Sequence, residues 1–205
     1  MTSTRSVRKV LARAVKVSAH SAYDLTGRSI NDLPEYFLSV KVAEEVHKHF
    51  KSFTFSMETP MSQLVKETQM DIEGECPSLR LGGKGKVDMV IRGNKSKNVK
   101  HIVEFKKHIG VKEIEKDALR LAAICLCTPG GHKAEKNFLV VVTHRNEALL
   151  KVRDINIKAL ISERFGEGTI KVTFEKIDLS PLKSTKSNGI NWPLLGGVWE
   201  FKYVG

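Results

Sequence analysis

The 205-residue sequence has few cysteines and no long uninterrupted apolar run. Three cysteines, Cys76, Cys125 and Cys127, do not form a disulfide framework, and this fits a reducing, cytoplasmic compartment. A transmembrane helix needs about 18 or more consecutive apolar residues, so no membrane span is predicted. The chain also has no repeat of roughly 20–50 residues and no long low-complexity linker. At this length, one domain spanning 1–205 is the simplest organisation.

The charge of the chain is strongly one-sided. Thirty-four Lys and Arg residues against 23 Asp and Glu residues leave a formal net charge of +11. Such an excess attracts polyanions, of which nucleic acid is the commonest in a cell, and an anionic membrane surface is the alternative. The basic N-terminus lacks the apolar core of a secretory signal. We predict a surface helix over about 4–17, with a mitochondrial-type presequence as the alternative.

Interleaved helical and strand patterns follow the N-terminal helix. In "NDLPEYFLSVKVAEEVHKHF", Asp32 is suited to be the N-cap of a helix. Residues 51–57 alternate like a strand, "VKEIEKDALRLAAICLCT" has a helical apolar stripe, and "NFLVVVTH" is typical of a buried strand. A helix around 147–165 precedes a C-terminal strand extension over about 168–205. These patterns predict an α/β domain with a central mixed β-sheet flanked by helices.

The stretch "GKVDMVIRGNKSKNVKHIVEFKKH", residues 85–108, is predicted to be a hairpin with unusual charges. Side chains alternate along strands. One face is therefore expected to carry Val87, Met89, Ile91, Val103 and Phe105, and the other Lys86, Asp88, Val90, Ile102, Glu104 and Lys106. A turn centred on Ser96 places Asp88 across from Glu104.

Two opposed carboxylates repel each other unless a proton or a divalent cation lies between them. Oxygen ligands at this separation suit Mg²⁺ or Mn²⁺. Lys106 points into the same space, where it could hold or deprotonate a water or neutralise a phosphate. The alternative is a solvated sheet face with a Glu/Lys ladder.

A third carboxylate is predicted to point inward from the preceding helix. On a helical wheel, Glu35 falls within the apolar arc formed by Tyr36, Val40, Val42, Ala43, Val46 and Phe50. A carboxylate aimed into a core is costly unless it is paired or coordinated. Glu35 is therefore a candidate metal ligand, and a capping box with Asp32 is the alternative.

Together these residues resemble the PD-(D/E)xK, or restriction-endonuclease-like, nuclease superfamily. The resemblance rests on Asp88 in "GKVDMVI", on Glu104-x-Lys106 in "VEFKK" and on the helical Glu35, and covers roughly residues 30–145. Val87 stands where the family motif has proline, which lowers the specificity of the match. The resemblance implies a restriction-endonuclease-like core and metal-dependent hydrolysis of phosphodiester bonds.

By this resemblance, Asp88 and Glu104 ligate Mg²⁺ or Mn²⁺ with the backbone carbonyl of Phe105, and Glu35 binds the metal directly or through water. Lys106 positions the attacking water. The residues expected to contact nucleic acid are Lys84, Lys86, Lys107, His108 and Arg120. For Asp117, Lys116 and Arg120, an exposed helical ion-pair face is the favoured interpretation.

Three other motifs in the sequence have weaker functional interpretations. "GGKGK" at 82–86 lacks the spacing of a phosphate-binding loop and precedes a strand, so we interpret it as a flexible lead-in. Cys125-x-Cys127 with His132 lacks a fourth zinc ligand, and buried structural cysteines are preferred. Trp192 and Trp199 are expected to anchor the C-terminal segment, with base stacking as the alternative.

The sequence thus predicts a metal-dependent nuclease acting on DNA, with RNA as the alternative substrate. Defence or DNA processing is the preferred setting. A homodimer or a larger protein partner would allow both strands to be cut. The alternative function is a catalytically inactive basic DNA-binding or assembly module with a nuclease-like fold.

Overall fold

The computed structural model describes residues 5–71, 85–128, 134, 136–144, 146–185 and 191–204. Its helices are α1 (Arg5–Thr26), the 3₁₀ helix η1 (Ile30–Asp32), α2 (Glu35–His49), α3 (Met61–Thr68), α4 (Val111–Cys127) and α5 (Glu147–Phe165). Its strands are β1 (Phe53–Pro60), β2 (Lys86–Gly93), β3 (Val99–Lys106), β4 (Asn137–Thr143), β5 (Ile170–Thr185) and β6 (Asn191–Tyr203).

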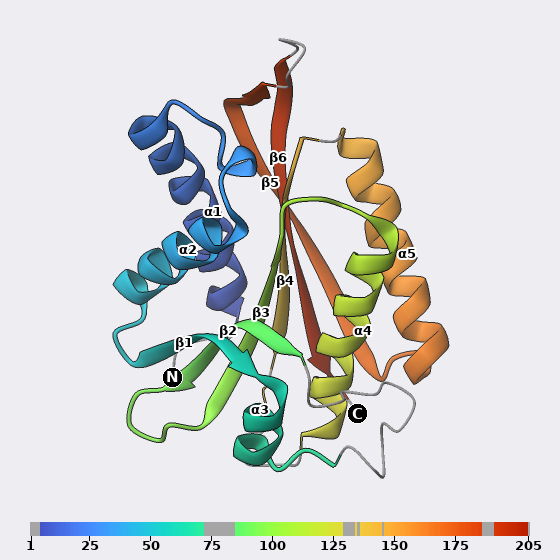
Figure 1. Ribbon diagram of the computed structural model, residues 1–205. Helices are drawn as coiled ribbons and strands as arrows, with labels where there is room; N and C mark the ends of the chain where they lie inside the picture. Colours follow the sequence, from blue (N-terminus) through green and yellow to red (C-terminus); the bar gives the residue numbers. More distant parts are fainter. Residues whose placement is uncertain are drawn as a thin grey trace.

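The six strands form one mixed sheet in the order β1-β2-β3-β4-β6-β5. Neighbouring strands are antiparallel except β3 and β4, which are parallel and are connected through α4. Helices α1 and α2 cover one face of the sheet, and α4 and α5 cover the other (Figure 1). The predicted α/β domain with a mixed sheet flanked by helices is therefore confirmed.

Local sequence explains several of these elements. Every residue of β4 is buried, as expected for a central strand covered on both faces. Helix α5 begins where the Asn146 side chain accepts a hydrogen bond from the Leu149 amide, and it ends at Gly166, whose φ of 86° suits glycine. Helix α1 continues to Thr26, well past the predicted end near residue 17, and stops at Gly27 with φ of 66°.

The start of α2 differs from the prediction. Asp32 lies in η1, and the N-cap position of α2 is Pro34, which makes no side-chain capping bond. Proline cannot offer a side-chain acceptor, and Asp32 lies two residues before the N-cap position. The capping box between Asp32 and Glu35 is therefore not formed, and Glu35 becomes the first residue of the helix.

The sheet separates two hydrophobic clusters, and their membership tests the predicted hairpin alternation. Met89, Ile91, Val103 and Phe105 share one face, as predicted, and this face packs on the α1/α2 side. Val87 packs instead on the α4/α5 side. The pairing between β1 and β2 skips Asp88 and its opposite residue Glu58, whose φ of 52° interrupts the pleat, so Val87 turns to the other face.

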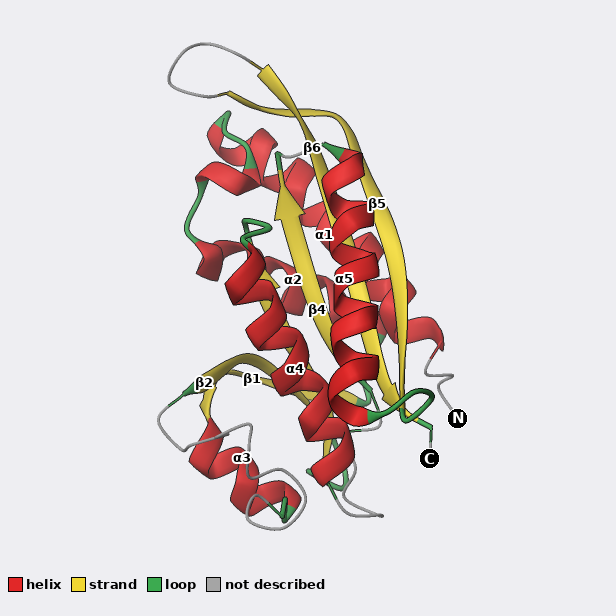
Figure 2. Cartoon of the chain, turned by 90° about the vertical axis from the view of Figure 1, so that its right-hand side faces the viewer, coloured by secondary structure: helices red, strands yellow, loops and turns green. Residues whose placement is uncertain are grey.

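The β5–β6 hairpin is longer than its neighbours and forms an arm, which we define as residues 179–185 and 191–194. Leu195 of β6 pairs with Thr143 at the C-terminal end of β4. Because β3 and β4 are parallel, the arm projects past the end of the sheet at which both strands finish (Figures 1 and 2). Among the helices of the described ranges, none is long and apolar enough to cross a membrane.

Candidate active site

The site lies where the paired ladder of β2 and β3 stops. The last described pair at this end is Met89 with Val103, and the same register carried one residue further sets Asp88 opposite Glu104, as predicted. The Asp88 carboxylate accepts a hydrogen bond of 2.7 Å from the Phe105 backbone N–H. The Asp88 side chain thus accepts the hydrogen bond that a neighbouring strand would accept from β3 if regular pairing continued.

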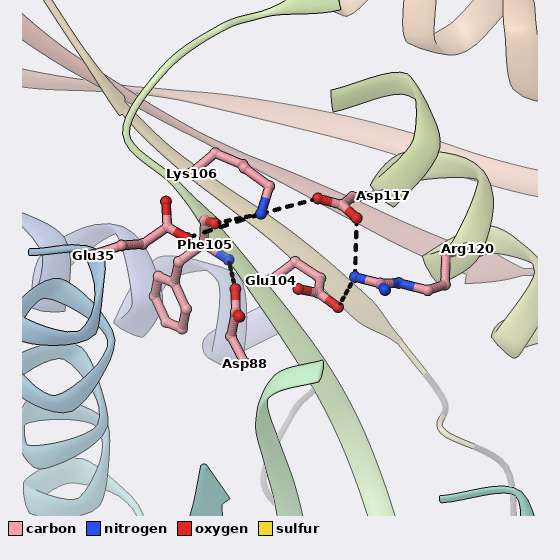
Figure 3. Close-up of polar contacts among 7 residues, drawn as sticks. All are labelled: Glu35, Asp88, Glu104, Phe105, Lys106, Asp117 and Arg120. Carbon is pink, nitrogen blue, oxygen red and sulfur yellow. Dashed lines mark hydrogen bonds and ion pairs between the residues drawn. The ribbon is translucent and has the colours of Figure 1, made fainter. Parts of the chain in front are cut away.

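Glu104 is the most deeply buried acid of the site, with 1% of its surface exposed. One of its oxygens, Oε1, accepts a hydrogen bond from Nη2 of Arg120 on α4 (Figure 3). Burial raises the pKa of Glu104 well above its ordinary value, and Arg120 opposes this effect. The neighbouring acids Asp88 and Asp117 raise that pKa further. Glu104 therefore lies in a site where additional positive charge would stabilise its ionised form.

Lys106 extends from the same face of β3 into a group of oxygen atoms. Its Nζ lies 3.0 Å from the Phe105 carbonyl oxygen, 3.1 Å from Oδ2 of Asp117 and 3.9 Å from Oε1 of Glu35. Burial acts to lower the pKa of Lys106, but Asp117 and Glu35 outweigh it and the pKa is raised. Lys106 is therefore held as an ammonium group.

Glu35 reaches the site from the first turn of α2 on the opposite side of β3 from α4 (Figure 3). Its side chain is 41% exposed, so it stands at the edge of the site rather than inside the core. Partial burial raises the pKa of Glu35, while Lys106 lowers it. Tyr36, which the helical wheel placed in the apolar arc, is 60% exposed, so α2 is rotated relative to the prediction.

Asp117 and Arg120 are more closely integrated in the site than the sequence indicated. Asp117 was expected on an exposed face, but it is only 5% exposed and accepts from both Lys106 and Arg120, the latter at 2.9 Å. Helix α4 thereby connects Glu104 to Lys106 through one shared acid. The available signal was the apolar stripe of this helix, because Asp117 lies three residues after Ile114 and four before Leu121, both buried.

The other predicted contact residues occupy different surroundings. Lys107 donates to the carbonyl oxygens of Asn31 and Leu33, and so ties the end of β3 to η1. The His108 ring lies 6.2 Å from that of His144 beside a pocket of about 350 Å³. Lys86 is exposed on β2, 3.8 Å from Glu58. Lys84 lies outside the described residues.

An open pocket of about 330 Å³ brings the charged groups to the surface. It is lined by Glu35, Lys106, Glu113, Lys116 and Asp117. Phosphate oxygens of a bound strand could therefore approach Lys106 directly from solvent. The pocket contains both signs of charge, so its affinity for a polyanion depends on how the carboxylates are neutralised.

The two helical cysteines are structural. Cys125 and Cys127 are both buried, and burial raises the pKa of the Cys125 thiol to about 12. Cys127 is disulfide-bonded, which the low cysteine count did not predict. His132 of the alternative zinc interpretation and most of the "GGKGK" stretch lie outside the described residues.

The donor chemistry of the site fits a hard cation, although the ligands are not gathered into a ready cluster. Within the described part of the chain, no group of three His, Cys, Asp or Glu side chains is placed to hold a metal ion. The oxygens of Asp88, Glu104 and the Phe105 carbonyl nevertheless form the oxygen-only set that Mg²⁺ and Mn²⁺ favour. Asp88 and Glu104 are also close enough for Asp88 to raise the pKa of Glu104, an effect that a cation between them would reverse.

No protein-family model matches the sequence, and no curated protein is significantly similar to it. The resemblance to PD-(D/E)xK nucleases therefore stays a prediction from Asp88, Glu104 and Lys106.

Proposed function

We propose that this protein is a metal-dependent nuclease that hydrolyses phosphodiester bonds, with DNA as the preferred substrate and RNA as the alternative. The observation that carries the proposal is the grouping of Asp88, Glu104 and Lys106 at the open end of one hairpin. The surplus of 11 positive charges over the chain supports a polyanionic substrate. A restriction-endonuclease-like core is part of the same proposal.

In this proposal, Asp88, Glu104 and the Phe105 carbonyl hold Mg²⁺ or Mn²⁺, and Glu35 contributes directly or through water. When bound there, the ion supplies a lowered pKa for the attacking water and positive charge beside the phosphorus. The water oxygen would form the new bond to phosphorus as the bond to the leaving sugar oxygen breaks. The proton of the water would pass to solvent, and the leaving oxygen would take up a proton from solvent. Lys106 is held as an ammonium group, so we expect it to orient the water or offset phosphate charge rather than accept the proton.

Asp117 and Arg120 act indirectly, through Lys106 and Glu104. Asp117 fixes the Lys106 ammonium, and the same carboxylate fixes Arg120 against Glu104. Neither residue needs to touch the substrate for this role. We regard both as positioning residues.

One observation favours the inactive binding module as a second candidate. Arg120 pairs with Glu104, and Lys106 pairs with Asp117, so all four of these groups are paired within the chain without any metal. A site that keeps this arrangement in the presence of Mn²⁺ would bind nucleic acid without cleaving it.

A cleavage assay separates the two candidates. Supercoiled plasmid and labelled single- and double-stranded oligonucleotides are incubated with the full chain in Mg²⁺, Mn²⁺ or EDTA. Cleavage that requires a divalent ion and is lost in Lys106→Ala and Glu104→Gln supports the nuclease. Lys112→Ala, an exposed change on α4, is the matched control. Cleavage by Lys106→Ala at the wild-type rate, or nucleic-acid binding without cleavage in either ion, contradicts the proposal.

A further inference from the structure

A polar notch of about 410 Å³ lies beside the candidate site, between the end of α1, η1 and the arm. It is lined by Tyr23, Gly27, Arg28, Ser29, Asp32 and Lys183. Helix η1 ends at Asp32, three residues before Glu35, so one wall of the notch continues directly into the first turn of α2. The other wall belongs to the arm, which projects past the same end of the sheet. The notch is therefore next to the site along the surface.

The donors of the notch suit phosphate oxygens. Arg28 donates from Nη2 to the Asp32 carbonyl oxygen at 3.2 Å, which holds the guanidinium against η1. A guanidinium has five N–H donors, and this contact uses one of its nitrogens. Lys183 is exposed on the arm and supplies a second cation. Asp32 is the one acid among the six lining residues, so the lining carries a net positive charge.

One aromatic side chain lines the notch beside these cations. Tyr23 is 49% exposed on α1. On the arm, the pair Ser184–Trp192 directly follows the pair Lys183–Pro193, so Trp192 leaves the opposite face of the hairpin from Lys183. Bases of a single strand can stack on a ring such as that of Tyr23, whereas the bases of a duplex are already stacked inside the helix. An exposed ring beside two cations therefore favours a single strand over a duplex.

We infer that the notch and the arm bind single-stranded nucleic acid that leads away from the candidate site. Arg28 and Lys183 contact the phosphates, and Tyr23 stacks on a base. The direction of the strand rests on the proposed nuclease function, but the binding surface itself can be tested without cleavage.

The test is fluorescence anisotropy of a labelled oligothymidylate with the full chain in EDTA, over a range of salt concentrations. Removing two phosphate contacts with Arg28→Ala/Lys183→Ala is expected to reduce the magnitude of the log–log salt slope by about 1.4, or about 0.7 for each contact to a single strand. Tyr23→Ala is expected to weaken binding by about fivefold to 150-fold, the range for base–aromatic stacking. Thermal melting checks that each variant is folded.

The matched control is Lys171→Ala/Lys202→Ala, which removes the same charge from an exposed pair at the far end of β5 and β6. This control is expected to keep the wild-type salt slope. Equal effects of the two double variants, or equal affinity for a duplex of the same length, would overturn the inference.

The outcome also separates this inference from the proposed function. If no divalent ion supports cleavage but the notch variants lose binding, the nuclease proposal fails and the binding surface stands. If the chain cleaves DNA but Arg28→Ala/Lys183→Ala binds and cleaves a single strand like the wild type, the inferred binding surface is wrong and the nuclease proposal is retained.

Discussion

Replacing Arg120 with glutamine tests the charge balance of the candidate site most directly. In the wild type, the guanidinium lies between Glu104 and Asp117. Asp117 keeps Lys106 as a partner in the variant, but Glu104 loses the cation that it contacts in the described structure. The variant therefore leaves a carboxylate that is 1% exposed next to Asp88, with no bound positive charge.

The expected loss of stability in Arg120→Gln follows from the burial of the Arg120–Glu104 ion pair. Removing one partner of a buried ion pair costs about 3–5 kcal/mol. The Arg120 side chain is 17% exposed, so part of the charge was already hydrated. We therefore expect the free energy of unfolding of Arg120→Gln to fall by about 3 kcal/mol near neutral pH, the lower end of that range.

The loss should also depend on pH. The pKa of Glu104 is raised in the folded protein, and it rises further without Arg120, which acts to lower it. Above the ordinary value of 4.5, the unfolded chain is ionised while the folded variant keeps its proton. Because the native state then binds more protons, the stability of the variant falls as the pH rises through this interval. The difference from wild type should be larger at about pH 8 than at about pH 5.

Urea unfolding in EDTA, followed by circular dichroism, measures both effects. Glu104→Gln/Arg120→Gln removes both charges and should recover most of the loss, which makes a double-mutant cycle. Lys112→Gln, an exposed change on the same helix, should stay within about 0.5 kcal/mol of wild type. A stable Arg120→Gln, or a loss that is the same at both pH values, would refute the view that Arg120 compensates a buried charge.

Three further predictions concern single groups. Asp117→Asn weakens the hold on Lys106, and kcat for cleavage should fall about 10- to 100-fold with little change in KM, as expected for a positioning role in the transition state. His101 is buried, and its pKa is lowered from 6.5 to about 4. At about 1.36 kcal/mol per pH unit, the wild type should therefore lose about 3 kcal/mol of stability as the pH falls across that interval. His101→Gln should show a flatter dependence of stability on pH in acid unfolding. The Cys125 thiol, with a pKa of about 12, should react with a thiol reagent only after the chain is unfolded in denaturant, and labelling of the native protein at about pH 8 would contradict its burial.

Local patterns in the sequence were sufficient for most of the fold. The unbroken apolar run of β4 predicted a central strand, and it lies between two covered faces. The alternation placed Met89 and Ile91 on one face correctly, and that face packs against α1 and α2. Val87 could not be placed, because its direction depends on the interruption at Glu58 in another strand. The sequence of the hairpin alone does not contain that information.

The candidate site was predictable where a single element determines it. The hairpin register opposed Asp88 and Glu104, and the helical wheel directed Glu35 toward β3, although that side chain stops at the edge of the site. The role of Arg120 was different, because it depends on how closely α4 packs on β3. A basic residue at the border of an apolar stripe can equally face solvent, a phosphate or a carboxylate. In the structure, Arg120 contacts the carboxylate of Glu104, which lies sixteen residues away in the sequence.

The charges of the site couple metal binding to nucleic-acid binding. Among the described residues, the four acids Glu35, Asp88, Glu104 and Asp117 lie around Lys106 and Arg120, and Lys107 also acts on Glu35. When all four acids are ionised, this small region is negative although the whole chain carries +11. A phosphate drawn to the basic surface would thus be repelled at the point where the proposed cleavage occurs. A divalent ion removes that repulsion, so each ligand should increase the affinity of the other by the same factor.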